Sequence, residues 1–423
     1  MAKVSQHGVP AEMRALVLDG VGFEHLQIRT VPTPRPGPRQ LLARVDAAGI
    51  CTSLIKLIEQ GPAHSLVYGW DVTRYPLILG DEGSVTLVEV GSELAGKYHS
   101  GERYVVQPAV DHAPINNRER YQNSAQGITK VAAGYTLPGH LAEYMLVPEE
   151  TLAAGCLLPV PSASIPYAHA AVSEPLSCAV SSQDHHVHLV QDTPLSPRVA
   201  HKGIKAGGVT VVIGAGPMGV MHIDVALSAC PRTIIVSDFI AARLRHVRDL
   251  FAARAHQLGI KLLTIDASST DMQTVVNEET SYLGADDVIV AVGVRQAIEG
   301  AQHHVGRGAV LNLFGGLKKG QDIVSFDTSL IHYKEINVTG SSGGSPWDIA
   351  HTLDLIGKGE INAGSHITRI GDLNHSIEFI DLIKKAQSDG KSVVYPHRPA
   401  TQVLAVPQWT ADDERAYLAQ SDR

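Results

Sequence analysis

Two patterns of apolar and polar residues divide this 423-residue chain. Between residues 13 and 147, short strand-like segments follow one another with turns between them, at 14–18, 40–45, 84–90 and 103–106. The proline-rich stretch 31–38 fits a connector, because proline has no N–H to donate to a strand ladder. This part of the chain is predicted to form a mostly β domain.

From Gly208 the pattern changes to short, almost wholly apolar segments separated by helix-like stretches. Continuous apolar strands that alternate with helices are typical of a parallel sheet covered on both faces. The segments expected to form strands are 209–213, 233–236, 261–265, 287–292, 309–314 and 336–339. Helices are predicted near 347–357 and 373–386, before a polar tail at 408–423. The fold class is therefore α/β, with a six-stranded, doubly wound parallel sheet.

Length and composition support two domains, because a single core rarely grows to this size. Apolar residues make up 44% of the chain and charged residues 18%, which is typical of a globular protein. The formal net charge is −8, which argues against a nucleic-acid partner, since such a partner favours a basic surface. A small-molecule ligand is therefore expected.

The four cysteines, Cys51, Cys156, Cys178 and Cys230, are scattered along the chain. Their spacing indicates neither a disulfide framework nor a structural zinc knuckle. No apolar run reaches the roughly 18 residues that span a bilayer, and the N-terminus lacks the apolar core of an export signal. A cytoplasmic protein without a membrane partner is expected.

The first apolar strand of the second part leads into Gly214, Ala215, Gly216, Pro217, Met218 and Gly219, and then into a predicted helix. In such a unit Gly214 permits the tight turn, Gly216 lets a pyrophosphate approach the backbone, and Gly219 allows the helix to pack on the strand. Pro217 and Met218 lie where phosphates meet the N-terminus of the helix. A dinucleotide site is predicted, with a glycine-rich turn that binds no ligand as the alternative.

An acidic residue, Asp238, ends the next apolar strand, nineteen residues beyond Gly219. Its carboxylate is placed to accept hydrogen bonds from both ribose hydroxyls and would repel a 2′-phosphate, which predicts NAD rather than NADP. Arg243 keeps the alternative open, because a guanidinium five residues further on would attract a phosphate or cover the adenine.

One thiol and three carboxylates precede the glycine-rich motif. Cys51 is followed by the run Gly80-Asp81-Glu82-Gly83 and later by Glu174. Zinc accepts sulfur and carboxylate oxygen as well as imidazole nitrogen. These side chains are therefore candidate ligands of a catalytic metal.

Ordered segments across nearly the whole chain resemble the medium-chain dehydrogenase/reductase superfamily, in its zinc-dependent alcohol and polyol branch. The matching segments are 48–53, 75–83, 101–105, 138–144 and 174–180. The resemblance implies a GroES-like, mostly β catalytic domain over 1–177, an NAD-binding Rossmann domain over 178–343, and a return to the catalytic domain over 344–423. It also implies a homodimer or a homotetramer.

By the same resemblance, Cys51 is the thiolate ligand, Glu174 is a carboxylate ligand, and Glu82 is a ligand or a catalytic carboxylate behind the ligands. Asp81 occupies the place of the family's histidine ligand. Carboxylates are harder donors than imidazole, so the site could also admit other divalent metals. The alternative is a member of the family that has lost its metal. The cysteines of the family's structural zinc lobe are missing between residues 107 and 135, so only the catalytic zinc is expected.

A further departure places Lys56 where the family has a relay histidine. Ser53 is expected to take the proton of the substrate hydroxyl, while Lys56 either passes it on or anchors an anionic group. A lysine with an ordinary pKa of about 10.4 is a poor base at neutral pH, which favours the anchor. Lys56, the run Glu59-Gln60-Gly61 and the insertion before the glycine motif are similar to the sorbose-1-phosphate reductase branch, whose members act on ketose phosphates.

Two other groups of residues leave alternatives open. Arg118 and Arg120 lie in the loop that corresponds to the missing zinc lobe, and they either meet a substrate phosphate or are solvated surface charges. His185, His186 and His188 fall in the segment 181–201, which looks like an insertion between domains. A solvated linker is the favoured interpretation, and a metal site is the alternative.

Together these features predict an oxidoreductase that interconverts a secondary alcohol of a polyol, sugar or sugar phosphate and its ketone, with NAD and one catalytic zinc. Two alternatives remain at this point. One is a metal-free reductase of the same fold, and the other is a protein that binds NAD without turning it over.

Overall fold

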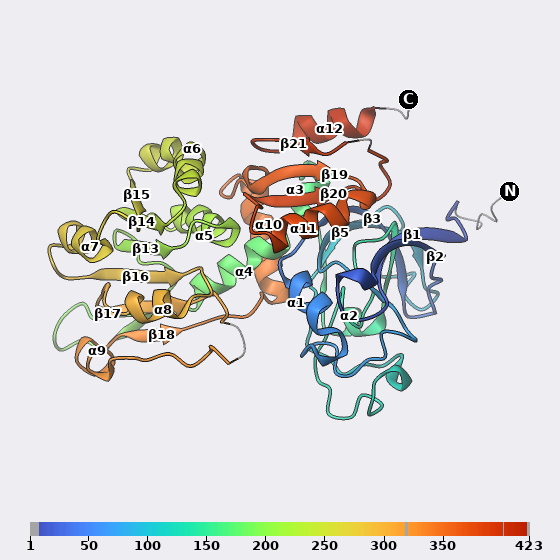
Figure 1. Ribbon diagram of the computed structural model, residues 1–423, viewed down its shortest axis with the longest axis horizontal. Helices are drawn as coiled ribbons and strands as arrows, with labels where there is room; N and C mark the ends of the chain where they lie inside the picture. The colour runs from blue at the N-terminus through green and yellow to red at the C-terminus, as the bar shows by residue number, and fades with distance from the viewer. Residues whose placement is uncertain (1–7, 318–319, 401, 421–423) are drawn as a thin grey trace. The chain divides into compact units, whose positions relative to one another are not determined.

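The computed structural model describes residues 8–317, 320–400 and 402–420, which form two compact units (Figure 1). The first unit comprises Met1–Glu174, Ser345–Gly359 and Ala363–Arg423. The second comprises Pro175–Gly344 and Glu360–Asn362. After Gly344 the chain therefore contributes mainly to the first unit again.

β-Sheets dominate the first unit. Its largest sheet has eight strands, in the order β10 (Leu157–Pro159), β6 (Arg103–Val106), β5 (Glu82–Val90), β3 (Leu41–Gly49), β20 (Lys391–Val394), β19 (Ile367–Gly371) and β21 (Leu404–Ala405), with β9 (Tyr144–Val147) also paired to β3. A second sheet has the order β2 (Leu26–Pro32), β1 (Glu12–Leu18) and β4 (Leu77–Ile78), and β7 (Ala109–Val110) pairs with β8 (Val131–Ala132).

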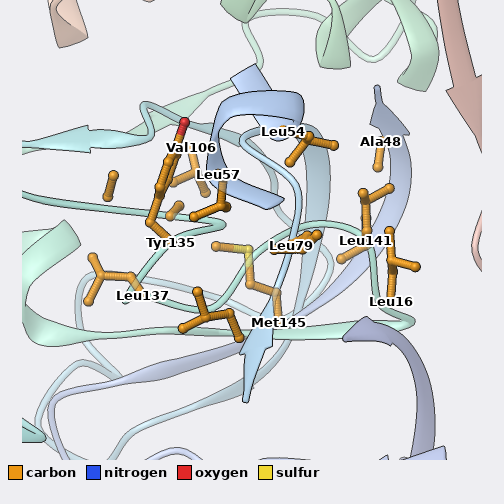
Figure 2. Packing of buried hydrophobic residues seen from close by; sticks show 14 of the residues in the cluster. Leu16, Ala48, Leu54, Leu57, Leu79, Val106, Tyr135, Leu137, Leu141 and Met145 are labelled. Atoms are coloured by element: carbon orange, nitrogen blue, oxygen red, sulfur yellow. The ribbon is translucent and has the colours of Figure 1, made fainter. Parts of the chain in front are cut away.

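The helices of the first unit are short. They are α1 (Ser53–Gln60), α2 (Glu149–Ala153), α3 (Tyr167–Ala171), α10 (Pro346–Lys358), α11 (Ser376–Lys384) and α12 (Ala411–Ala419), and α4 (Ser173–Asp184) begins at its boundary. Figure 2 shows Leu54 and Leu57 of α1 in the same apolar cluster as Leu79 and Leu141. This burial fixes α1, and with it the side chains that leave its first turn.

The pairing of β3 with β5 decides where the candidate ligands lie. The two strands are antiparallel, and Gly49 at the end of β3 lies opposite Glu82 at the start of β5. Cys51 follows β3 by two residues, while Asp81 precedes β5 by one. Residues that are thirty positions apart in the sequence are thus brought to the same end of the sheet.

The second unit contains a six-stranded parallel sheet, as predicted. Its order is β15 (Lys261–Asp266), β14 (Thr233–Asp238), β13 (Val209–Ile213), β16 (Ala285–Val290), β17 (Val305–Leu313) and β18 (Asn337–Thr339), which Figure 1 shows as one succession. The helices of this unit are α5 (Pro217–Ser228), α6 (Ala241–Gln257), α7 (Met272–Thr280), α8 (Arg295–Ala301) and α9 (Thr328–Lys334).

Helices cover both faces of this sheet, because its central strands are apolar on both sides. Val212 of β13 packs in a cluster with residues of α5 and α6. Its neighbour Val211 packs in the opposite cluster, which includes Val276 of α7 and Ile298 of α8. The doubly wound α/β arrangement follows directly from this alternation.

The predicted solvated linker at 181–201 is wrong for two of its three histidines. The segment forms a hairpin, β11 (Val187–Val190) with β12 (Val199–Lys202). His186 and His188 are buried and contact Asp287 of β16. Their burial needs a partner about a hundred residues further along the chain, which a local composition pattern does not reveal.

Among the described residues, no helix is long and apolar enough to cross a membrane.

Candidate active site

Cys51 lies in the turn between β3 and α1. Its sulfur accepts a hydrogen bond from the backbone N–H of Ser53, with an N to Sγ distance of 3.4 Å. Burial, and after it the charges of Asp81 and Glu82, raises the pKa of the Cys51 thiol well above its usual range. A cation bound at this place would reverse the effect, since it favours the thiolate.

Asp81 follows Gly80, whose φ of 104° is in a region that favours glycine. The Asp81 side chain is buried, and the Ser53 hydroxyl donates to its Oδ2 atom at 2.5 Å. The other oxygen, Oδ1, is buried and has no hydrogen-bond partner among the described residues. Burial, followed by the charge of Glu82, raises the pKa of Asp81 to about 6, although the bond from Ser53 opposes this shift.

Glu82 is fully buried at the start of β5 and is paired with a lysine from the end of the chain. The Nζ atom of Lys391, in β20, lies 2.5 Å from Glu82 Oε1 and also donates to the carbonyl oxygen of Ile50 at 3.1 Å. Although burial alone would lower the pKa of Lys391, the charges of Glu82 and Cys51 raise it. The second oxygen, Glu82 Oε2, has no partner in the described part of the chain.

These side chains fit a divalent cation. One ligand atom from each of Cys51, Asp81 and Glu82 lies within 4.8 Å of the other two. Two buried carboxylate oxygens without a partner are costly unless a cation or a proton satisfies them. Glu174, in the first turn of α4, is buried but lies outside this group of three; its charge also raises the pKa of Cys51.

Tyr135 adds a hydroxyl to this site. Burial, and then the charge of Asp81, raises the pKa of Tyr135, while a side-chain hydrogen bond with Ser53 lowers it. Figure 2 shows its oxygen pointing away from Leu137 and Met145. Ser53 is therefore hydrogen-bonded with both Asp81 and Tyr135.

Lys56 is exposed and lies one helical turn beyond Ser53 on α1. The His64 ring lies 5.2 Å from the Tyr135 ring, centroid to centroid. Burial, and then the charge of Lys56, lowers the pKa of His64. A cationic side chain, an imidazole and a phenol thus gather beside Ser53.

The two arginines of the 116–120 loop are held by their own surroundings. Arg118 Nε donates to the carbonyl oxygen of Pro114 at 2.7 Å. The Arg120 guanidinium stacks over the rings of Trp70 and Tyr75, at 5.5 and 4.8 Å from their centroids. Arg120 is therefore more than a solvated surface charge.

In the second unit, the glycine-rich loop connects β13 to α5. Gly214 has a φ of 102°, and a Cβ on Gly219 would lie 1.8 Å from the carbonyl oxygen of Gly214. A Cβ on Gly216 would meet only Arg243, at 4.0 Å. Pro217 and Met218 are the first two residues of α5. The loop therefore leaves room above Gly216, which is what the approach of a pyrophosphate requires.

A cavity of about 470 Å³ opens beside this loop. Its lining includes Gly214, Asp238, Phe239, Ile240 and Arg243. The Asp238 carboxylate accepts hydrogen bonds from the backbone N–H groups of Ala215 and Ile240, both at 2.8 Å. Arg243 Nη1 lies 3.6 Å from Asp238 Oδ2. The cavity suits the adenosine half of a dinucleotide, with Asp238 held firmly at its edge.

Two regions of the chain match known families of domains. Residues 37–160 match the alcohol dehydrogenase GroES-like domain, and residues 217–358 match the zinc-binding dehydrogenase family. Mannitol-1-phosphate 5-dehydrogenase of Aliivibrio fischeri (strain ATCC 700601 / ES114) is 30% identical over 409 residues, which cover 95% of this chain and 89% of that protein. The chain belongs to the zinc-binding alcohol dehydrogenase family.

Other relatives of this dehydrogenase agree. L-sorbose 1-phosphate reductase of Klebsiella pneumoniae is 27% identical over 381 residues, which cover 88% of this chain and 86% of that protein. An NADP-bound crystal structure of a protein from Sinorhizobium meliloti 1021, described as a zinc-binding dehydrogenase, has a TM-score of 0.70 and 26% identity and covers 91% and 99% of the two chains. 2R,3R-butanediol dehydrogenase from Bacillus subtilis shares the fold, with a TM-score of 0.71 at 22% identity and coverage of 91% and 100%.

The comparisons confirm the predicted superfamily, the α/β fold with its GroES-like domain, and an oxidoreductase of the alcohol and polyol class. They also confirm the predicted cofactors, a nicotinamide dinucleotide and zinc. Sequence reasoning missed Lys391, Tyr135 and His64. Lys391 carried one signal, a lysine that opens an apolar strand, whereas nothing local marked the other two.

Proposed function

We propose that this dehydrogenase interconverts a secondary alcohol of a phosphorylated polyol or sugar and the corresponding ketone. The observation that carries the proposal is the group formed by Cys51, Asp81 and Glu82, with two buried carboxylate oxygens that lack partners. This group offers a thiolate and carboxylates to one ion, as a catalytic zinc site requires.

Cys51 and Asp81 Oδ1 would hold the ion, and Glu174 and the Oε2 atom of Glu82 would complete the set. When bound, zinc supplies Lewis-acid polarisation of the substrate oxygen, and NAD(P) accepts or returns the hydride. Because Oε1 of Glu82 is paired with Lys391, Oε2 is the oxygen that would be available to an ion.

Ser53 acts on the substrate proton. Its own proton is committed to Asp81 Oδ2, so its oxygen is left to accept a hydrogen bond from the substrate hydroxyl. Asp81 is therefore the next group on this path, and Tyr135, which is hydrogen-bonded with Ser53, helps to hold the hydroxyl in place. The three residues orient the alcohol and hold its proton.

Lys56 and His64 anchor the phosphate. Lys56 lies one turn of α1 beyond Ser53, and it has no ion-pair partner among the described residues. His64 adds a second nitrogen-bearing group close to Lys56. The two relatives named above act, by their names, on mannitol 1-phosphate and L-sorbose 1-phosphate. A phosphate on the substrate of this chain would give the exposed Lys56 ammonium a function.

NAD is the proposed cofactor rather than NADP. The support is Asp238, whose carboxylate is fixed by two backbone amides at the rim of the cavity. A 2′-phosphate there would be repelled by the carboxylate. Arg243, which lies beside Asp238, is proposed to cover the adenine.

Self-association through the second unit is part of the proposal. Strand β18 is an edge strand, and α9 next to it in sequence has no buried residue. Tyr333 of α9 is 76% exposed and Val338 of β18 is 39% exposed. Exposed apolar groups beside an unpaired strand edge support a homodimer or a homotetramer.

A cytoplasmic location is also proposed. Cys51, Cys156, Cys178 and Cys230 form no disulfide in the described part of the chain, which fits a reducing compartment.

The test of the proposed function compares ketose phosphates with their unphosphorylated counterparts in an NADH oxidation assay of the zinc-loaded protein. Lys56→Met should raise KM for the phosphorylated ketose by about 10-fold to 100-fold, because a charge-assisted contact is lost. KM for the unphosphorylated ketose should stay the same. Lys97→Met, at another exposed lysine, is the matched control.

Three outcomes would contradict the proposal. Equal increases in KM for both ketoses in Lys56→Met would show that Lys56 does not bind a phosphate. Full activity after complete removal of zinc by a chelator would favour a metal-free reductase, and tight NADH binding without turnover of any ketose would favour a protein that only binds the nucleotide.

A further inference from the structure

A second cluster of metal-binding side chains lies in the second unit, apart from the residues described above. It consists of His186, His188 and Asp287, whose side chains are 0%, 7% and 0% exposed. His188 is the second residue of β11, and His186 directly precedes the strand. Because the two are two residues apart, their imidazoles point to the same side. Asp287 comes from β16, in the interior of the parallel sheet.

Both imidazoles converge on one carboxylate oxygen. His186 Nδ1 lies 2.6 Å and His188 Nε2 lies 2.9 Å from Asp287 Oδ1. One ligand atom from each of the three residues lies within 4.8 Å of the others. The three donor atoms thus lie close enough together to share one ion.

The second oxygen of the Asp287 carboxylate has a hydrogen-bond partner of its own. The backbone N–H of Lys205 donates to Asp287 Oδ2 at 2.9 Å, which fixes the plane of the carboxylate. Partners of this kind, behind the ligand atom, are the usual means by which proteins orient the ligands of a metal. Asp287 therefore presents Oδ1 to the histidines in a fixed direction.

Among the described residues, the two histidines are the ion-pair partners of this buried carboxylate, and no lysine or arginine side chain pairs with it. The ammonium group of Lys205, the nearest lysine in the network, pairs instead with Asp286 Oδ1 at 2.6 Å. A buried carboxylate needs a cation, a proton or a metal as its partner. Within the described residues, only the two imidazoles are available to Asp287 Oδ1.

We propose that His186, His188 and Asp287 bind a divalent transition-metal ion, with zinc as the best match, in a second site that is separate from the active site. Two neutral imidazoles and one carboxylate are a donor set that suits zinc, and a solvent molecule completes the tetrahedron. Zinc ligands at about 2.0–2.1 Å lie roughly 3.3 Å apart in a tetrahedron. The two contacts with Oδ1, now at 2.6 and 2.9 Å, would therefore widen by about 0.7 and 0.4 Å.

The site has a structural role. It joins the β11–β12 hairpin, which is inserted ahead of the glycine-rich loop, to the central sheet through β16. The burial of all three ligands leaves little access for a substrate, which distinguishes the site from a catalytic one.

The two sites differ in the type of their ligands, which X-ray absorption can distinguish. The active-site group contains a thiol and carboxylates but no histidine, whereas the second site contains two histidines. X-ray absorption at the zinc edge detects imidazole ligands by their outer-shell scattering. Tag-free, zinc-loaded protein is therefore expected to hold about two zinc ions per chain and to show imidazole scattering.

Variants show which of the two sites gives the zinc content and the imidazole scattering. In the double variant Cys51→Ser/Asp81→Asn, which disables the active site, about one zinc ion per chain should remain and should retain its imidazole scattering. Adding His188→Asn to this background should reduce the zinc content to near zero. His201→Asn, at the exposed residue that faces His188 across the hairpin, should leave the content unchanged.

Two results would overturn the second site. One is a zinc-loaded wild-type protein without imidazole scattering, a result that needs no variant to fold. The other is a folded Cys51→Ser/Asp81→Asn protein that binds no zinc, or whose zinc content is the same with His188→Asn as with His201→Asn. Neither result bears on the proposed dehydrogenase function, which depends on the active-site zinc alone.

Discussion

The ammonium group of Lys391 and the carboxylate of Glu82 form a buried ion pair, with Nζ 2.5 Å from Oε1 and side chains that are 8% and 0% exposed. The pair joins β20, near the end of the chain, to β5 in the first half. It supplies the only positive side chain that the described residues place among Cys51, Asp81 and Glu82. Each partner makes the burial of the other possible.

We expect Lys391→Met to lower the free energy of unfolding by about 3–5 kcal/mol, because it leaves the Glu82 carboxylate buried and uncompensated. The double variant Lys391→Met/Glu82→Gln should recover a large part of this loss. Urea denaturation of the wild type and the variants measures both values. Equal losses in the single and the double variant would contradict the interpretation of a coupled pair.

Asp81 and Ser53 give a prediction about metal affinity. Asp81→Ala should weaken zinc binding by more than about 100-fold, because it removes a ligand atom, whereas Asp81→His should preserve or strengthen it. Ser53→Ala should weaken zinc binding by about 10-fold to 100-fold, since Ser53 orients Asp81 and is not itself a ligand. Competition with a chromophoric chelator gives the dissociation constants. Zinc binding that is indifferent to all three changes would indicate that the site has been abandoned.

Substitutions at Gly216 and Gly219 are expected to distinguish an effect on nucleotide binding from an effect on folding. A Cβ on Gly216, whose φ is −72°, meets almost nothing in the protein, whereas a Cβ on Gly219 would lie 1.8 Å from a backbone oxygen. Gly216→Ala should therefore leave the stability within about 0.5 kcal/mol. It should raise the Kd for NADH by at least about 10-fold, because the methyl group occupies the approach of the pyrophosphate.

Gly219→Ala should behave in the opposite way and lower the free energy of unfolding by about 2 kcal/mol or more. Thermal unfolding and NADH fluorescence titration of both variants make the comparison. A Gly216→Ala protein that binds NADH as tightly as the wild type would show that the pyrophosphate does not pass over this residue.

The sequence predicts best those parts of the fold that are formed by one continuous segment. The strand β13, the turn at Gly214 and the helix α5 form one continuous segment, so the sequence shows them together. Cys51 and Asp81 were assigned to one site through family resemblance. In the structure, the register of β3 against β5 explains their proximity.

The missed features depend on partners far away in the chain. Lys391 lies 309 residues from Glu82. The polar tail is another case, because it forms helix α12, and its buried Glu414 accepts hydrogen bonds from the backbone N–H groups of Tyr167 and Ala168. The local sequence around a glutamate in a polar segment does not predict that its carboxylate will accept hydrogen bonds at the start of a helix far away in the chain.

His140 gives a prediction about pH. It is fully buried behind the turn that carries Asp81, with Nδ1 at 3.2 Å from the carbonyl oxygen of Gly80. Burial lowers the pKa of His140 to about 4, although the contact with Gly80 opposes this shift. The folded protein therefore keeps this imidazole neutral at a pH at which the unfolded chain, with a histidine pKa of about 6.5, binds a proton.

As the pH falls from about 6.5 to about 4, this difference favours the unfolded state, and the loss stops growing below about 4. A pKa difference of about 2.5 corresponds to a loss of about 3 kcal/mol. His140→Gln should remove this part of the pH dependence, whereas His201→Gln, at an exposed position, should retain it. The free energy of unfolding in urea at pH 7 and pH 4.5 measures the slopes, and parallel slopes for the wild type and His140→Gln would show that His140 becomes protonated within the folded protein.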